Sequence, residues 1–313
     1  MLMTATERTS STRTRKTDLS PHAHLLPGAL VHRRQLTEVL LTALERTSDS
    51  TFVAHVHWPR RHAYFGPWGT DDVAVGPALA LETLRQTAIA LAHLHLGVPF
   101  GQAFVMESMR VEVADDAVRR SDRPGSPTID VVVSELVERK GVAASYDSML
   151  TVRDGDHVLA RGGGRARTIP GPVYRRMREG APSSADVDRL PPRPSPAAHG
   201  LVGAPTPDFV LLSGAAGSDA FELSLDATNP VYFDHPLDHV PGMVVLEAAL
   251  QAFRAHADDP THTPREVTVE FLAHAELTSP VTITLEREDG TEVAVLCQDG
   301  VVVSRVRASA FPG

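Results

Sequence analysis

Two polar groups interrupt stretches that are otherwise apolar, and their residue types and spacing fit acid–base chemistry. Glu82, Arg85 and Gln86 lie within the segment PALALETLRQTAIALAHL, and at spacings of three and four residues they would share one face of a helix. The segment MVVLEAALQAF repeats this glutamate and glutamine as Glu247 and Gln251. A carboxylate in such surroundings can take a proton from a substrate or hold a cation, so both glutamates are candidate catalytic residues.

The cost of burying charge allows two interpretations of these residues. A helix that is apolar nearly all round is buried, and a buried carboxylate is costly unless it is paired or hydrogen-bonded. In the first interpretation, Arg85 only neutralises Glu82 inside a core. In the second, their shared helix face lines a cleft. The recurrence of Glu-x-x-x-Gln in the second segment favours the second, functional interpretation.

Each apolar segment is preceded by a loop that contains histidines and aromatic residues. His62 lies in RRHAYFGP, and His235 lies in FDHPLDHVPG, which also contains His239. Histidine titrates near neutral pH and often acts as a general acid or base beside a carboxylate. His62 and His235 are therefore candidate catalytic residues, because both precede a helix that carries a glutamate.

Several other kinds of chemistry have no motif in this sequence. No His, Cys and Asp cluster has zinc-ligand spacing, so neither a metal nor a cofactor is expected. The three glycines at 162–164 are not followed by the Lys-Ser/Thr of a phosphate-binding loop. No Gly-x-Ser-x-Gly nucleophile elbow is present either.

Length and composition are typical of a soluble two-domain protein. The chain has 313 residues, of which 42% are hydrophobic and 22% charged. A net charge of −9 disfavours a protein that coats nucleic acid. The single cysteine, Cys297, excludes an intramolecular disulfide and fits the cytoplasm. No apolar stretch is long enough to predict a membrane-spanning helix.

Proline divides the chain into two folded units. Nine prolines lie between residues 170 and 207, and proline resists both helix and central strand. A short segment at 30–44 has apolar residues at helical spacing and predicts an extra amphipathic helix on the first unit. The expected divisions are a disordered tail (1–24), a first unit with the extra helix (25–170), a proline-rich linker (171–205) and a second unit (206–313).

The two units repeat one another. Both run from a strand through a histidine-containing loop and an apolar helix to another strand. Short segments rich in Val, Thr and Ile follow, and Asp-Gly turns separate several of them. Such close hairpins indicate antiparallel pairing. Each unit is therefore predicted to wrap an antiparallel sheet around one buried helix.

The sequence resembles the AfsA family, the A-factor (γ-butyrolactone) biosynthesis proteins. The motifs that carry the resemblance are LVHRRQLTEVLLT, HWPRRHAYFGP, LETLRQTAIALAH with GVPFGQAFVM, and FDHPLDHVPGMVVLEA. The resemblance implies an α+β fold of two tandem hotdog domains, each with an antiparallel sheet wrapped around a central helix. The two domains would form a pseudo-dimer in one chain, and the protein would be a monomer or a homodimer.

The resemblance also implies an acyltransferase. Its partners would be an acyl carrier protein that carries a β-ketoacyl group as a thioester, and dihydroxyacetone phosphate, whose hydroxyl accepts that group. Two alternatives stay open. One is a hotdog dehydratase or thioesterase that acts on acyl thioesters. The other is a non-catalytic regulator that binds an acyl or butyrolactone ligand.

Related dehydratases take their catalytic histidine and acid from different hotdog units. By that analogy His235 would pair with Glu82, and His62 would pair with Glu247. The first pair is favoured because an arginine lies beside its glutamate, whereas the second helix has Leu250 at the equivalent place.

The transfer also needs groups that bind the substrates. Amides at a helix start can stabilise a developing oxyanion, and an arginine can bind a phosphate. The candidate substrate-binding residues are Arg85, Gln86, Gln251, Gly242, Arg60 and Arg61.

Overall fold

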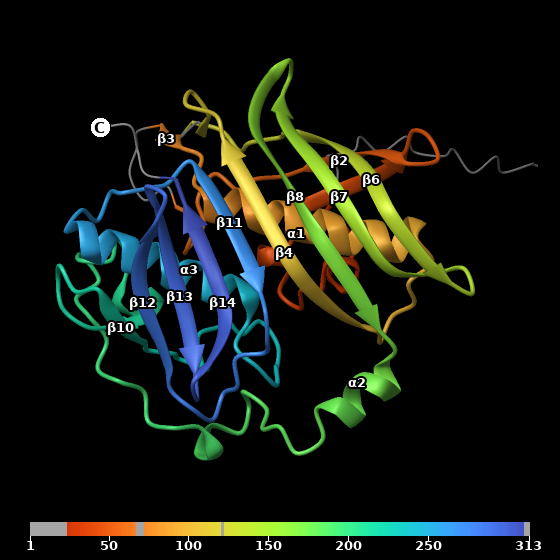
Figure 1. The fold of residues 1–313 in the computed structure, drawn as a ribbon. Helices are drawn as coiled ribbons and strands as arrows, with labels where there is room; N and C mark the ends of the chain where they lie inside the picture. The colour runs from red at the N-terminus through yellow and green to blue at the C-terminus, as the bar shows by residue number, and fades with distance from the viewer. Residues whose placement is uncertain (1–23, 67–71, 120–121, 310–313) are drawn as a thin grey trace, which may run out of the picture.

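The computed structural model describes residues 24–66, 72–119 and 122–309, and Figure 1 shows its ribbon. The first half contains β1 (Leu41–Arg46), β2 (Thr51–Val56), β3 (Val73–Ala74), α1 (Pro77–His95), β4 (Ala103–Val113), β5 (Val118–Arg119), β6 (Thr128–Arg139), β7 (Val142–Asp154) and β8 (His157–Ile169). The second half contains β9 (Leu212–Ser213), β10 (Ala220–Leu223), α3 (Gly242–Ala257), β11 (Glu266–Phe271), β12 (Val281–Glu288), β13 (Thr291–Gln298) and β14 (Val301–Ala308). Helix α2 (Gly171–Met177) lies between the halves, and short 3-10 helices are η1 (Gly28–Val31), η2 (Leu36–Glu38), η3 (Val187–Arg189) and η4 (Pro207–Phe209).

Twelve strands form one continuous sheet that runs through both halves. Its order is β1-β2-β6-β7-β8-β4-β11-β14-β13-β12-β10-β9, whereas β3 and β5 pair separately. The halves join where β4 pairs with β11, from Glu112 opposite Glu266 to Ser108 opposite Glu270. The predicted antiparallel hairpins are present, since β6, β7 and β8 follow one another in the sheet, as do β12, β13 and β14.

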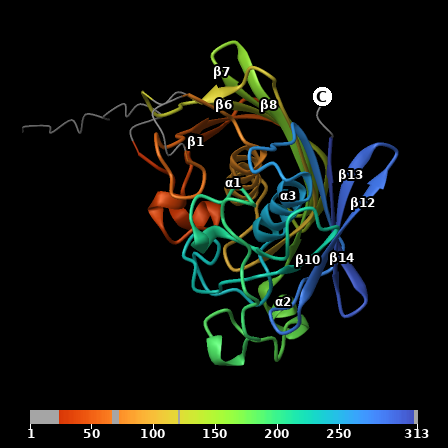
Figure 2. The ribbon, with the colours of Figure 1, turned by 90° about the vertical axis from the view of Figure 1, so that its left-hand side faces the viewer.

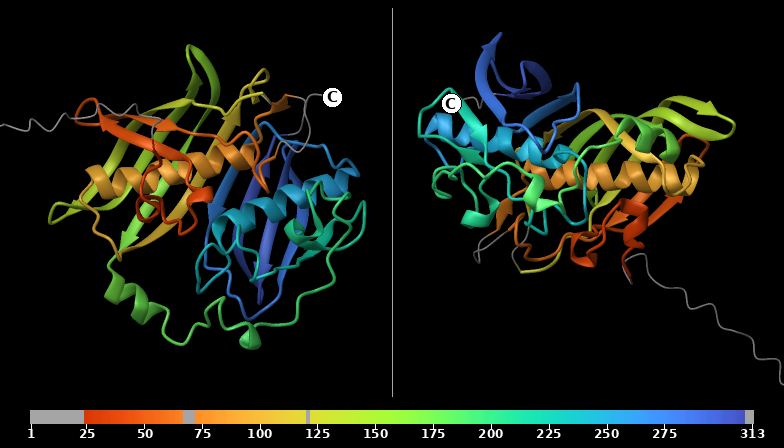
Figure 3. Two further views of the ribbon diagram at one scale, coloured as in Figure 1. Left: turned by 180° about the vertical axis from the view of Figure 1, so that it is seen from behind. Right: turned by 90° about the horizontal axis from the view of Figure 1, so that it is seen from below.

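The two long helices lie on the same side of this sheet and contact each other (Figure 2). Seen from behind, each helix crosses the strands of its own half (Figure 3). Most residues of α1 and α3 are buried, because the sheet wraps around them. The structure therefore has the predicted α+β architecture, with one central helix in each half.

One of the three glycines of β8, Gly162, allows α1 to pack closely on the sheet. A Cβ added at Gly162 would lie 2.6 Å from the Leu84 Cδ1 of α1 and 2.3 Å from the carbonyl oxygen of Arg110 on β4. These glycines serve packing, in keeping with the absence of a phosphate-binding motif. The same close approach buries Leu84 and Leu81 of α1.

The amphipathic helix predicted over residues 30–44 is not formed. The segment contains η2 and the start of β1, and its consecutive apolar residues Val39, Leu40 and Leu41 are all buried. The backbone amide of Leu40 donates to the side chain of Gln86 on α1. Contacts with α1 on one side and the sheet on the other therefore favour an extended backbone over the helix that the spacing indicated.

The segment predicted as a linker, 171–205, begins with α2 and then follows the second half of the molecule (Figure 1). The backbone amide of Ala197 donates to the carbonyl of Leu212, and Arg193 donates to the carbonyl of Val210. Residues 1–23 of the predicted disordered tail lie outside the described residues. None of the helices within the described ranges has the length and apolar character needed to cross a membrane.

The packing of β8 on α1 predicts the effect of one methyl group. Gly162→Ala should lower the free energy of unfolding by about 1–3 kcal/mol, because backbone and a buried leucine both occupy the required space. Gly200→Ala is the control, since an added Cβ there meets no atom within 4 Å and should change stability by less than about 0.5 kcal/mol. Urea unfolding measures both, and equal midpoints would contradict this account of the glycines.

Candidate active site

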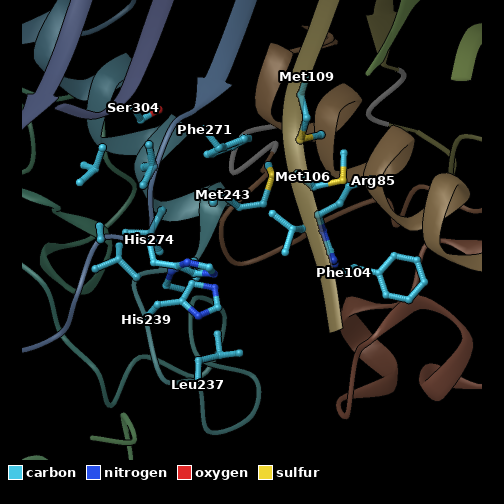
Figure 4. A pocket seen from close by; sticks show the side chains of 18 of the residues that line it. Arg85, Phe104, Met106, Met109, Leu237, His239, Met243, Phe271, His274 and Ser304 are labelled. Atoms are coloured by element: carbon cyan, nitrogen blue, oxygen red, sulfur yellow. The ribbon is translucent and has the colours of Figure 1, made fainter. Parts of the chain in front are cut away.

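A cavity of about 630 Å³ lies between the two halves, where β4 and β11 separate. The two strands pair only as far as Ser108 and Glu270. Beyond that point β4 continues to pair with β8, after a register shift between Met106 and Ser108, and β11 ends at Phe271. The divergence of two neighbouring strands therefore opens the space that the cavity occupies (Figure 4).

One wall of the cavity is apolar and adaptable. It includes Met106 and Met109 from β4, Met243 from α3, Phe271 at the end of β11 and Ile89 from α1. Figure 4 labels the three methionines and Phe271 among the side chains that line the cavity. Unbranched thioether side chains can adjust to different apolar shapes, so this wall fits an aliphatic chain.

A cationic cluster forms another part of the wall. Arg33 and Arg85 line the cavity, and both donate to the buried carboxylate of Glu82, with closest N···O distances of 2.7 and 2.8 Å. Gln86 Nε2 donates to the same carboxylate at 2.7 Å. Burial alone would raise the pKa of Glu82, but the two arginine charges and the hydrogen bonds from Arg85 and Gln86 hold it well below its ordinary value.

Both carboxylate oxygens of Glu82 already accept hydrogen bonds, which changes the predicted role of this residue. It is 2% exposed, lies behind the two arginines and does not belong to the described lining of the cavity. A carboxylate held ionised in this way is a poor proton acceptor. The structure therefore supports the interpretation in which Arg85 neutralises Glu82, and it also brings two guanidinium groups to a cavity wall, where they can bind an anion.

Two histidines lie near this cationic wall. Burial, followed by the charge of Arg85, lowers the pKa of His32 to about 3, and its Nε2 lies 2.9 Å from Nε2 of His93. His235 also lines the cavity, and burial lowers its pKa. Its Nδ1 lies 3.7 Å from Asp234 Oδ2, which is beyond hydrogen-bond distance. Both rings are therefore kept neutral.

The predicted pair of His62 and Glu247 is not formed among the described residues. Nδ1 of His62 accepts the backbone N–H groups of Tyr64 and Phe65, so its Nε2 is the donor to Glu38 Oε1 at 3.3 Å. The ring thus closes a turn within its own half. The sequence places a histidine and a tyrosine in this loop. The tyrosine, Tyr64, is the one that contacts the second half, at Glu247.

Glu247 has partners that enclose it completely. The Tyr64 hydroxyl donates to it, Gln251 Nε2 donates at 3.1 Å, and Arg254 Nη1 donates at 3.1 Å. Arg254 thus supplies the cation that is missing at Leu250, one helical turn earlier. Glu247 is 4% exposed and does not contribute to the described cavity lining.

Both predicted glutamines bind backbone and not the cavity. Gln86 accepts the N–H of Leu40 and donates to the carbonyl of Glu38, and Gln251 accepts the N–H of Leu211 and donates to the carbonyl of Phe209. In this structure the buried backbone of an adjacent segment therefore uses both ends of each amide. Arg60 and Arg61 are exposed and are not part of the described lining.

The predicted His235–Glu82 pair is also not formed among the described residues, because Arg33 and Arg85 occupy both oxygens of the carboxylate. Gly242, in contrast, lines the cavity at the start of α3. The first amides of a helix have no partner within it and carry partial positive charge. The amides of Gly242 and Met243 can therefore stabilise an oxyanion in the cavity.

A further polar group at the cavity was missed by sequence reasoning. His239 and His274 line the cavity, and Nδ1 of His239 lies 2.6 Å from Asp238 Oδ1. The adjacent Asp and His in the motif FDHPLDHVPG were the available signal. His274 follows β11, and nothing in the sequence places it near that motif. No group of three or more His, Cys, Asp or Glu side chains within the described ranges is arranged to hold a metal ion.

Comparisons with known proteins agree with a fold of two repeated units. A family model described as "A-factor biosynthesis hotdog domain" (AfsA) matches residues 14–170 and 185–309, in keeping with two tandem hotdog units. A 2-oxo-3-(phosphooxy)propyl 3-oxoalkanoate synthase from Streptomyces virginiae is 35% identical over 83% of this chain and 87% of that protein. A synthase of the same name from Streptomyces coelicolor is 30% identical over 92% and 93%.

Two solved structures are similar to this chain at low identity. An acyl-ACP thioesterase from Bacteroides thetaiotaomicron is 13% identical, with a TM-score of 0.48 over 82% of this chain and 97% of that chain. The 12:0-ACP thioesterase from Umbellularia californica is 14% identical, with a TM-score of 0.43 over 83% and 98%.

The Glu82 cluster predicts how stability depends on pH. The native pKa of Glu82 lies below its ordinary value of 4.5, so its stabilising effect is complete above that pH and is lost as the pH falls further. Glu82→Gln should cost about 3 kcal/mol at pH 7, because two buried guanidinium groups lose their counter-charge. The difference from the native chain should shrink below about pH 4.5.

Urea unfolding at several pH values measures this effect. Glu266→Gln is the matched control, because Glu266 pairs with Arg110 on the surface, where the two side chains are 43% and 57% exposed. Its cost should stay below about 1 kcal/mol. If both variants lost the same free energy of unfolding, the buried cluster would contribute no more to stability than a surface ion pair.

Proposed function

The chain belongs to the AfsA family of A-factor biosynthesis hotdog proteins, as its motifs predicted, and from this premise we propose that it is a 2-oxo-3-(phosphooxy)propyl 3-oxoalkanoate synthase. The product of such an enzyme is the ester of a 3-oxoalkanoic acid with dihydroxyacetone phosphate. The enzyme is therefore an acyltransferase that moves a 3-oxoacyl group from a thioester to a hydroxyl of dihydroxyacetone phosphate.

The observation that carries the proposal is the composition of the cavity between the halves. The reaction requires a cationic place for a phosphate and an apolar place for an acyl chain within reach of each other. Arg33 and Arg85 supply the first, and the wall of Met106, Met109 and Met243 supplies the second. Guanidinium groups bind phosphate with charge-assisted hydrogen bonds in a planar geometry, so the acceptor's phosphate binds at the arginines.

In this proposal Glu82 acts as a positioning residue and not as the base. Its carboxylate holds Arg33 and Arg85 in fixed orientations, while both guanidinium groups keep hydrogen-bond donors that Glu82 does not use. His235 and Gly242 stay in the site, at the wall and at the oxyanion position, respectively. The start of α3 then holds the thioester carbonyl, because its amides meet the charge that develops during transfer.

The acyl donor is an acyl carrier protein thioester, a partner that the family resemblance suggests. A second cavity of about 390 Å³ supports an entry route for its thioester arm, since it shares His32, Phe104, Leu237 and His239 with the first cavity. The enzyme works in the cytoplasm, where both substrates occur. It works as a monomer or a homodimer, and the sheet that the two halves share gives the pairing of hotdog units within one chain.

An activity assay tests the proposal directly. The purified chain, incubated with a 3-oxoacyl thioester and dihydroxyacetone phosphate, should give a phosphorylated ester that mass spectrometry detects. Formation of free acid or enoyl thioester at the same rate without the acceptor would favour a thioesterase or dehydratase instead. Binding without any turnover would favour a regulator.

Arg85→Gln tests the phosphate site. The KM for dihydroxyacetone phosphate should rise about tenfold or more, since a hydrogen bond to a charged group contributes about 1.5–3 kcal/mol. The KM for the thioester should stay within about twofold. Arg110→Gln, at an exposed arginine paired with Glu266, should change neither constant. An unchanged KM for the phosphate acceptor in Arg85→Gln would exclude Arg85 from the phosphate site.

A further inference from the structure

The cavity has a second polar end, across from Arg85, where His239 and His274 lie next to each other (Figure 4). Their ring centroids are 4.9 Å apart and the rings are nearly perpendicular. His239 lies in the loop that leads into α3, three residues before Gly242. The amide of Val240 in this loop donates to the carbonyl of Ala275, which ties the loop to the segment that carries His274.

His239 is oriented by a carboxylate. Its Nδ1 lies 2.6 Å from Oδ1 of Asp238. Burial would raise the pKa of Asp238, but the hydrogen bond and charge of His239, the hydrogen bond from Tyr174 and the charge of Arg178 hold it well below its ordinary value. Because the ionised carboxylate can only accept hydrogen bonds, Nδ1 of His239 carries a proton, and in the neutral form of the ring the lone pair lies on Nε2.

The carboxylate is itself held by the segment between the two halves. The Tyr174 hydroxyl of α2 donates to Asp238 Oδ1 at 3.0 Å, and Nε of Arg178, directly after α2, donates to Oδ2 at 3.1 Å. Arg178 is fixed in turn by Glu276, with N···O distances of 2.6 and 2.7 Å. Asp238 therefore has a defined orientation before any substrate binds.

Other histidines of the cavity lack such a carboxylate. Nδ1 of His235 lies 3.7 Å from Asp234, and His32 contacts His93. Burial, followed by the charge of His239, lowers the pKa of His274. Among the described residues that line the cavity, His239 is thus the histidine with a carboxylate within hydrogen-bond distance of its ring.

We propose that His239 is the general base of the acyl transfer, with Asp238 as its positioning residue and the segment of Tyr174 and Arg178 as the support of that pair. This inference rests on the proposed function, and it moves the catalytic base from the predicted Glu82 and His235 to the other end of the cavity. A histidine whose Nδ1–H is bound by a carboxylate presents Nε2 to a substrate hydroxyl, as in hydrolases that use a carboxylate–histidine pair.

The acyl transfer forms one C–O bond and breaks one C–S bond. Nε2 of His239 takes the proton of the acceptor hydroxyl while the hydroxyl oxygen forms a bond to the thioester carbonyl carbon. The amides at the start of α3 bind the oxyanion of the tetrahedral intermediate. When the intermediate collapses, the C–S bond breaks and the imidazolium returns its proton to the leaving thiolate. The net reaction converts a thioester and an alcohol into an ester and a thiol.

His239→Gln tests the base. In the full-length chain, kcat for ester formation should fall about 100-fold or more, which is the usual size of a general-base effect. The KM for dihydroxyacetone phosphate should stay within about twofold, since its phosphate binds at Arg33 and Arg85 and not at this histidine. His256→Gln is the matched control, because His256 also lies beside a carboxylate, 3.1 Å from Asp219, but on the surface. Its kcat should stay within about twofold.

Asp238→Asn tests the positioning role with an isosteric side chain. Its kcat should fall while its KM values and melting temperature stay close to those of the native chain. A purely structural role would change the melting temperature and leave kcat of the folded protein intact. If His239→Gln does not fold, His239→Gly assayed with added imidazole replaces it, and a rate that rises with imidazole concentration supports the base.

The outcomes separate the two proposals. A native chain that forms no ester from the thioester and dihydroxyacetone phosphate overturns the proposed function. A native chain that forms the ester, with His239→Gln or imidazole-free His239→Gly active within threefold of it, overturns only the assignment of the base. A strong loss in His239→Gln together with an unaffected Asp238→Asn overturns the role of Asp238 alone.

Discussion

A buried glutamine on each central helix fixes that helix to the chain segment that crosses it, and the rest of the structure depends on this contact. Gln86 binds the backbone of Glu38 and Leu40, and Gln251 binds the backbone of Phe209 and Leu211. Buried backbone groups without a partner would be costly. The two amides therefore set the position of α1 and α3 under the sheet, and the cavity lies between helices placed in this way.

The glutamates that accompany these glutamines explain how a duplicated fold has one open site. Glu247 is neutralised by Arg254 and accepts a hydrogen bond from Tyr64, and none of the three belongs to the described lining of the cavity. Glu82 is neutralised by Arg33 and Arg85, which line it. Both carboxylates satisfy the same rule that a buried charge needs partners. The partners of Glu247 lie outside the described lining, so its cluster is part of the core. The partners of Glu82 lie in the lining, so its cluster forms an anion-binding wall.

The sequence predicts the fold better than the site, for a physical reason. Apolar spacing and Asp-Gly turns are patterns of a few residues, and the internal repeat shows the same patterns twice. The two helices and the antiparallel hairpins therefore followed from local patterns. The partners of His62 and Glu82 are set by side chains distant in sequence, such as Glu38 and Arg33. The extended run at Val39 was misread as helix because contacts on both of its sides override its spacing.

The segment between the halves is the part of the chain whose composition conceals its role. Its prolines indicate an extended connection, yet Tyr174 and Arg178 bind Asp238, and Arg178 also binds Glu276 after β11. A guanidinium that bridges two carboxylates of the second half fixes the path of the chain as it leaves the first half. The sheet joins the two halves directly through β4 and β11. The segment is held to the second half by side-chain hydrogen bonds and ion pairs instead of strand pairing.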